Sequence, residues 1–255
     1  MIMKLLGLSA IILLSLSALA QDSPAKSDPS TGQKNQNESD TAIQLGQPVQ
    51  VVDPVIGNEL REKDVASVLS GTMTDDGTFK DVTLAGGDTK LGNAAIRAIP
   101  GWRYTASTEN GKPVDLKVFI IIQCKRGKFS TSLEPDLPFP TSPRTPIKDL
   151  VSKGELFIIV KPGLVEYPKE TYAPEPEYSE AGRILSYRAT AVFGMIIGRD
   201  GTASDIWVAT KAGLGLDQKG IQTLRKWKFQ PATKEGKPVP VLVNIEVVFH
   251  PTDVS

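Results

Sequence analysis

Apolar and polar residues alternate along several stretches of this chain, which is the pattern of β-strands with one buried face. The pair Asp200-Gly201 interrupts one such alternation, and Asp76-Gly77 interrupts another. Asp-Gly between alternating stretches is typical of a β-hairpin, because both residues tolerate the positive φ angles of a tight turn. The apolar positions that alternate around Asp200-Gly201 are Phe193, Met195, Ile197, Ile206 and Val208. The pattern therefore predicts two hairpins.

Each hairpin is followed by a stretch with helical periodicity. Its apolar positions recur in steps of four, four and three, which places them on one face of a helix. They are Leu91, Ala95, Ile99 and Trp102 in the first stretch, and Leu216, Gly220, Leu224 and Trp227 in the second. Asp217 is predicted to cap the second helix by accepting from its first-turn amides. Gly92, Asn93 and Pro100 predict that the first helix is shorter or bent.

A β-branched strand closes each set of elements. Its inward face is predicted to hold Val241, Val243, Ile245, Val247 and Phe249, with Leu116, Val118, Ile120, Ile122 and Cys124 as the counterparts in the first set. The other face would hold Leu242, Asn244, Glu246, Val248 and His250. The predicted fold class is α+β: two ββαβ modules, each a small antiparallel sheet covered by one helix. Such a sheet has edges, which are rows of unpaired amides and carbonyls.

The motifs of the two sets recur in the same order, with one residue inserted in the second set. The matching segments are 76–78 with 200–202, 102–104 with 227–229, and 111–114 with 236–239. A shared turn, a shared aromatic-basic-aromatic triplet and a shared Gly-Lys-Pro-Val are not expected by chance. The sequence therefore predicts a duplicated module, the signature of an internal repeat.

The 255 residues, 40% of them hydrophobic, are enough for two small domains. Residues 21–46 are too poor in apolar side chains to fold, and residues 129–176 are rich in proline. Within the latter, only Glu155 to Val160 has the character of a strand, one that would dock on a neighbouring domain. The predicted organisation is a signal peptide (1–20), a disordered tether (21–46), module 1 (47–128), a proline-rich linker (129–176) and module 2 (177–255).

The N-terminus has the layout of a signal peptide. Lys4 precedes the uncharged run from Leu5 to Ala20, and the run ends in Ala18-Leu19-Ala20, a small-x-small pattern. Such a signal peptide would direct export to the periplasm and be cleaved off before Gln21. The alternative is an uncleaved inner-membrane anchor, but a helix of this length spans about 24 Å, against about 30 Å of hydrocarbon.

Charge and residue inventory argue against several function classes. The 29 basic and 29 acidic residues give a net charge of zero, so no nucleic-acid partner is expected. Cys124 is the only cysteine and His250 the only histidine, which leaves no residues for a disulfide or a Cys-based metal cluster. Cys124 is expected to be buried and His250 to lie exposed at a strand end. We expect neither an enzyme nor a cofactor.

Several motifs of module 2 together resemble the C-terminal domain of the TonB family. They are the Asp-Gly hairpin, a helix that opens with Leu-Asp, the segment WKFQPA (227–232), the segment GKPVPV (236–241) and a last strand that ends in Phe. The resemblance covers about 178–250 and is weaker over 65–125, where Ala106 replaces the proline found at Pro231. The motif residues with a structural role are Asp76, Gly77, Trp102, Asp200, Gly201, Trp227, Phe229, Pro231 and Gly236.

The resemblance implies an envelope protein whose last strand pairs with an extended segment, the TonB box, of an outer-membrane receptor. The residues expected to bind the partner strand are Val241, Val243, Asn244, Ile245 and Val247. Strand exchange between exposed edges would give a homodimer.

Two other functions remain open from the sequence. One is a membrane-anchored TonB energy transducer. Against it, the N-terminal run lacks the family's histidine, and residues 21–46 reach only about 28 Å, too short for the family's Pro-Lys stalk. The other is an enzyme with a cleft between the modules, which the residue inventory argues against.

Overall fold

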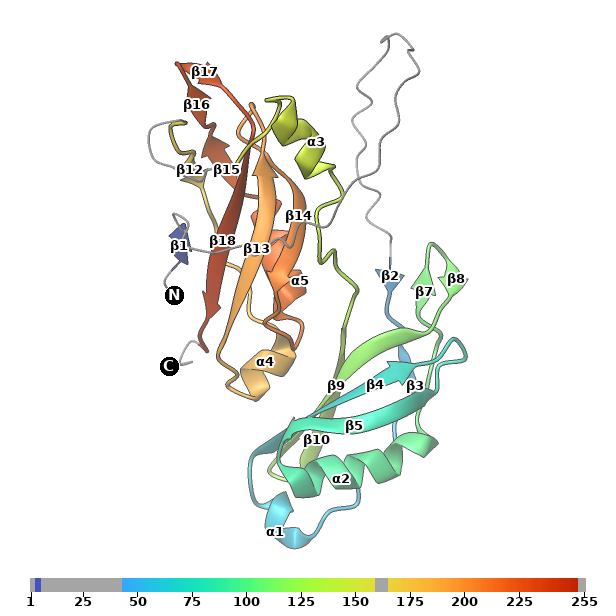
Figure 1. Cartoon of the computed structure of the whole chain (residues 1–255). Coiled ribbons are helices and arrows are strands. Elements are labelled where there is room, and N and C mark those ends of the chain that lie inside the picture. Colours follow the sequence, from blue (N-terminus) through green and yellow to red (C-terminus); the bar gives the residue numbers. More distant parts are fainter. Residues whose placement is uncertain (1–2, 6–42, 159–164, 252–255) are drawn as a thin grey trace, which may run out of the picture.

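The computed structural model describes residues 3–5, 43–158 and 165–251. Its first large sheet has the strand order β10-β9-β4-β5, with every neighbouring pair antiparallel. The strands are β4 (Val65–Met73), β5 (Phe79–Gly87), β9 (Leu116–Lys125) and β10 (Lys128–Pro135). One face is covered by α2 (Thr89–Ala98), which continues into a 3-10 turn, η1 (Ile99–Gly101) (Figure 1).

The second large sheet repeats this order around a different set of strands. β13 (Ala189–Ile197) lies between β14 (Ala203–Thr210) and β18 (Val241–Phe249), all antiparallel, and α5 (Leu216–Leu224) follows the hairpin. The short strands β1 (Met3–Leu5) and β11 (Phe157–Ile158) also pair with β18. Both sheets thus have the ββαβ order, and the predicted fold class is confirmed.

Smaller elements surround the two sheets. Two-stranded pairs are formed by β3 (Pro48–Gln50) with β6 (Arg103–Tyr104), β12 (Lys169–Tyr172) with β15 (Lys228–Gln230), and β16 (Thr233–Lys234) with β17 (Lys237–Pro238). A three-stranded sheet contains β2 (Ile43–Gln44), β7 (Thr108–Glu109) and β8 (Lys112–Pro113). The short helices are α1 (Asn58–Arg61), α3 (Ile147–Ser152) and α4 (Glu180–Ile184).

The stretch expected to be a plain linker, 129–176, contains most of β10 together with α3, β11 and β12. The sequence does not indicate β10 as a strand, because few of its residues are apolar. Phe129 and Leu133 pack on the core, whereas Lys128, Ser130 and Ser132 form its exposed face. The strand predicted within Glu155 to Val160 is confirmed as β11, which docks on β18; residues 159 and 160 lie outside the described residues.

Most of the predicted leader and tether also lies outside the described residues, which include only Met3–Leu5 and the stretch from residue 43 of those segments. Among the residues that are described, none belongs to a helix with the length and apolar character needed to cross a membrane.

Each module has its own hydrophobic core, with a tryptophan at its centre. Trp102 is 0% exposed and Trp227 is 1% exposed, and every other position of the two predicted helix stripes is buried. The indole nitrogen of Trp102 donates to the carbonyl of Val52 at 2.8 Å, and that of Trp227 donates to the carbonyl of Pro174 at 3.1 Å. Each tryptophan therefore ties a segment that precedes the hairpin of its module to the core.

The predicted cap of α5 and the predicted shortening of the first helix are wrong. The N-cap of α5 is Gly215, at φ 76°, and the Asp217 carboxylate accepts instead from the amides of Ala212 and Gly213 at 2.8 and 2.7 Å. The left-handed glycine lets the chain turn so that this carboxylate faces the preceding loop. The first helix is not shorter, since α2 has 10 residues and α5 has 9; Asp88 caps α2, and Pro100 is accommodated in η1.

The two Asp-Gly hairpins are also wider than a two-residue turn. Within the two turns, only the glycines have positive φ, 79° at Gly77 and 75° at Gly201. The backbone hydrogen bonds that close the turns join Thr74 with Thr78 and Gly198 with Thr202. The carbonyl of Gly77 accepts from Tyr104, and that of Gly201 accepts from Phe229 at 2.9 Å. A hydrogen bond thus joins the turn to the aromatic-basic-aromatic triplet in each module, which explains why the two motifs occur together.

This contact predicts a large penalty for Gly201→Ala. A Cβ at residue 201 would lie 1.9 Å from the Phe229 carbonyl oxygen, in addition to the strain of positive φ. Gly236→Ala is the matched control, because Gly236 has φ 76° but a Cβ there would meet nothing within 4 Å. In urea melts, we expect Gly236→Ala to cost about 1 kcal/mol and Gly201→Ala clearly more. Equal losses would contradict the importance of the contact with Phe229.

The first hairpin also carries a titratable group. The Asp76 carboxylate accepts from the hydroxyls of Thr74 and Thr78 at 2.6 and 2.7 Å and from the Thr78 amide at 3.0 Å. These donors, Thr74 first, lower the pKa of Asp76 from 3.8 to about 2. The stabilisation is therefore complete above about pH 4 and is lost as the pH falls toward 2. Asp76→Asn should weaken the pH dependence of unfolding in this range; an unchanged dependence would contradict the assignment.

The modules contact each other through the face of the first sheet opposite α2. Val68, Phe119 and Ile121 form a small buried cluster with Ala181 of α4, and Leu185 and Leu214 pack around it. The Glu134 carboxylate of β10 accepts from the amides of Ala181 and Glu180 at 3.1 and 3.4 Å. Burial raises the pKa of Glu134, and the two amide donors partly offset this. β10 is thus held by both modules.

Candidate strand-binding edge

The last strand of module 2 has one edge that is continuously paired and one that is not. β13 pairs with β18 along its whole length, from Ala189 opposite Phe249 to Ile197 opposite Val241. On the opposite side, here called the outer edge of β18, β11 pairs with Val241 and Leu242, and β1 pairs with Ile245 to Val247. Among the described residues, two short segments from distant parts of the chain cover this outer edge, and Figure 1 shows β1 beside β18.

The backbone direction at the outer edge follows from one hydrogen bond. The Phe157 amide donates to the Pro240 carbonyl at 3.1 Å, so residue 240 points its polar backbone groups toward the outer edge. Successive residues of a strand point these groups to opposite sides, and the pairing of β13 with β18 has no register shift. The amides of Asn244, Glu246 and Val248 therefore face the outer edge, whereas those of the odd-numbered residues face β13.

This geometry divides the five predicted binding residues into two groups. The side chains of Val241, Val243, Ile245 and Val247 are buried, at 0 to 7% exposed, and pack in the core of module 2. Asn244 is half-buried and presents its backbone at the outer edge. The four apolar residues thus hold the strand in place, and Asn244 offers the hydrogen-bonding groups.

Sequence reasoning missed Leu242, Glu246 and Val248, which share the backbone direction of Asn244. Their side chains are half-buried on the face opposite α5. The signal that could have identified them is Pro240, because proline in a sheet sits where the ladder does not need its amide. The position of this proline therefore indicates that the even-numbered residues of β18 direct their backbone groups toward the outer edge.

The corresponding edge of module 1 is closed. β10 pairs with β9 continuously, from Lys128 opposite Lys125 to Pro135 opposite Val118. The order β10-β9-β4-β5 places β10 where β1 and β11 lie in the order around β18-β13-β14. The two modules therefore differ in how much of this edge their own chain covers.

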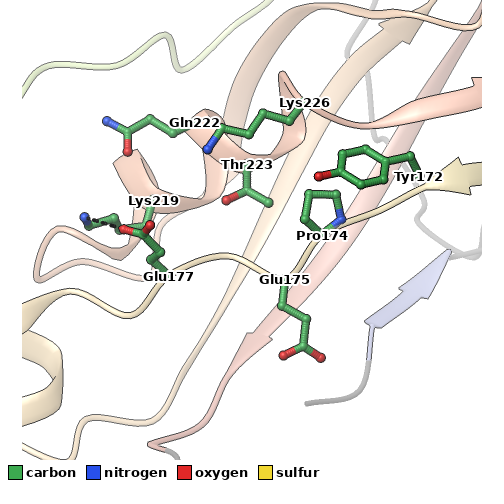
Figure 2. A pocket seen from close by; sticks show the side chains of 8 residues that line it. All are labelled: Tyr172, Pro174, Glu175, Glu177, Lys219, Gln222, Thr223 and Lys226. Carbon is green, nitrogen blue, oxygen red and sulfur yellow. Dashed lines mark hydrogen bonds and ion pairs between the residues drawn. The ribbon is translucent and has the colours of Figure 1, made fainter.

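A surface groove lies on the other side of module 2. Figure 2 shows it between α5, which contributes Lys219 and Thr223, and the segment from Tyr172 to Glu177. It encloses about 240 Å³, and an ion pair of 3.3 Å links Glu177 with Lys219. None of its lining residues is a serine, cysteine or histidine.

The remaining candidates for chemistry are isolated. His250 is exposed just past β18, and Cys124 is fully buried, as predicted. In the part of the chain that the structure describes, no three His, Cys, Asp or Glu side chains gather as a metal site would require.

Comparison with known proteins finds a family model that is similar to most of module 2. Residues 174–251 match the family model described as Gram-negative bacterial TonB protein C-terminal. A solved structure titled "Solution NMR structure of Pseudomonas aeruginosa TonB CTD" is 22% identical and covers 36% of this chain and 93% of that chain, with a TM-score of 0.27. No curated protein matches the chain.

Proposed function

We propose that this chain, whose residues 174–251 match the TonB C-terminal family model, is an envelope protein that binds an extended segment of a partner protein. The segment would add as a strand to the outer edge of β18, so that backbone hydrogen bonds supply most of the affinity and neighbouring side chains supply selectivity. The protein would act by binding and not by catalysis.

One observation carries this proposal: the discontinuous pairing of the outer edge of β18. An unpaired strand edge is a template for another strand, and proteins normally cover it or interrupt it with charges and prolines. Here β11 covers two residues, and β1 comes from the predicted signal peptide. Cleavage before Gln21 would remove β1, and no other described strand pairs with the outer edge between Val243 and Phe249.

The partner is proposed to be an outer-membrane receptor with a TonB-box-like segment, and the location the periplasm. The test is calorimetry with residues 21–255 and a synthetic peptide that spans the TonB box of a receptor from the same organism. We expect saturable binding of one peptide per chain. Absence of binding would overturn the proposed function.

The anchored energy transducer differs from this proposal at the N-terminus. N-terminal sequencing of the exported protein separates the two, because a mature chain that begins at Gln21 cannot be held by residues 5–20. We expect Gln21 as the first residue; an intact Met1 in the membrane fraction would favour the transducer.

A further inference from the structure

We infer that β10 is an internal partner strand that locks the edge of module 1, so that module 2 alone receives an external peptide. This inference rests on the proposed function of β18. It also supports the proposed duplication, because both modules have room for one more strand beside their last strand. In module 1, β10 of the same chain occupies this place.

The hydrogen bonding of β10 leaves no room for a competing strand. The Asp136 amide donates to the Lys117 carbonyl at 2.8 Å, so the odd-numbered residues of β9 face β10. In the antiparallel register, these residues lie opposite the even-numbered residues of β10, such as Ser130 and Ser132. The amides of Ser130 and Ser132 therefore complete the ladder, while the Thr131 amide faces away from β9.

Chain connectivity makes this strand hard to displace. Only Arg126 and Gly127 connect β9 with β10, and both have positive φ, at 49° and 75°, as in the two-residue turns favoured by hairpins. An intramolecular strand with so short a connection has an effective concentration in the millimolar range or above. A free peptide at micromolar concentration would lose this competition.

β10 is fixed on its other sides as well. Phe129 and Leu133 pack against the core of module 1, and Glu134 accepts from two amides at the start of α4. Displacement of β10 would thus also break a contact between the modules. Within the described residues, β11 pairs with two residues of β18 and β1 with three, so neither matches the continuity of β10 with β9.

The first test uses a matched pair of prolines and a synthetic peptide with the sequence of residues 128–135 as the probe. Ser132→Pro removes a ladder amide from an exposed position, whereas Thr131→Pro removes an amide that β9 does not use. By calorimetry, Ser132→Pro should bind one more probe peptide per chain than Thr131→Pro. Equal stoichiometries, or a wild-type protein that already binds two, would overturn the inference.

The second test attaches a copy of β10 to module 2. It can be interpreted even if Ser132→Pro unfolds module 1. In this variant, a copy of residues 126–135 replaces residues 251–255, so that β18 acquires the hairpin partner of β9. Binding of the TonB-box peptide should fall at least tenfold, and a control graft with proline in place of the copied Ser132 should restore it. Undiminished binding by the first graft would overturn the inference. If wild-type protein binds no TonB-box peptide, the proposed function fails. The comparison of Ser132→Pro with Thr131→Pro still tests whether β10 blocks the edge of module 1.

Discussion

Replacing Asn244 with proline should abolish peptide capture and leave the fold of module 2 largely intact. The Asn244 amide faces the outer edge, where no described strand pairs with residue 244. Proline removes this donor, and its ring also obstructs a strand that approaches from that side. Calorimetry should show binding reduced beyond detection, while the circular dichroism spectrum and melting temperature stay close to those of wild type. Asn244→Ala, which keeps the amide, should weaken binding only modestly.

Ile245→Pro is the matched opposite. The Ile245 amide faces β13, so its loss breaks the ladder inside module 2, and a buried side chain is lost with it. We expect this variant to be destabilised by about 3 kcal/mol or more and to unfold within module 2. If both prolines unfold the protein, β18 is not an edge strand. If Asn244→Pro binds the peptide as wild type does, recognition occurs elsewhere, and the groove of Figure 2 becomes the next candidate.

Truncation of Trp227 should have the largest effect on stability. Its ring is 1% exposed, packs near Phe229 at 5.9 Å between ring centroids, and donates a hydrogen bond to Pro174. Trp227→Ala would create a cavity and remove that bond, at a cost of about 3 to 5 kcal/mol. A small domain has only about 5 to 15 kcal/mol of total stability. The far-ultraviolet signal of module 2 should therefore be lost at or near room temperature.

Trp102→Ala provides the comparison within the same chain. Trp102 occupies the same position in module 1 and is 0% exposed. Its replacement by alanine should therefore destabilise module 1 by a similar amount. In the Trp102→Ala variant, binding of peptide to module 2 should persist, because β18 belongs to the other core. A melt within a degree or two of wild type for Trp227→Ala would contradict its place at the centre of the core.

The main elements could be predicted from the sequence because they depend on local periodicity. The period-two alternation in β18 and the helical stripe that ends in Trp227 each place apolar residues on one face, and burial of that face decides the structure. Asp200-Gly201 marked the hairpin, although the turn is wider than predicted, because only Gly201 needs positive φ and the Phe229 carbonyl fixes its position.

What could not be predicted depends on contacts between distant segments. β10 has too few apolar residues to read as a strand, and it is stabilised by pairing with β9 and by the contact of Glu134 with α4. Asp217 has the residue type of a cap, yet its carboxylate meets the amides of the preceding loop because of the left-handed Gly215. Local sequence names the groups that can bond, while tertiary structure selects their partners.

The central claim is that a partner strand pairs with the outer edge of β18. Amide exchange resolved by residue, measured by NMR on residues 21–255 with and without the TonB-box peptide, tests it most directly. The amides of Val243, Ile245 and Val247 should exchange slowly in both states, because they face β13. Those of Asn244, Glu246 and Val248 should exchange fast in the free protein and slowly in the complex. Protection that appears along α5 and residues 172–177 instead, with the even-numbered amides of β18 unchanged, would contradict the account.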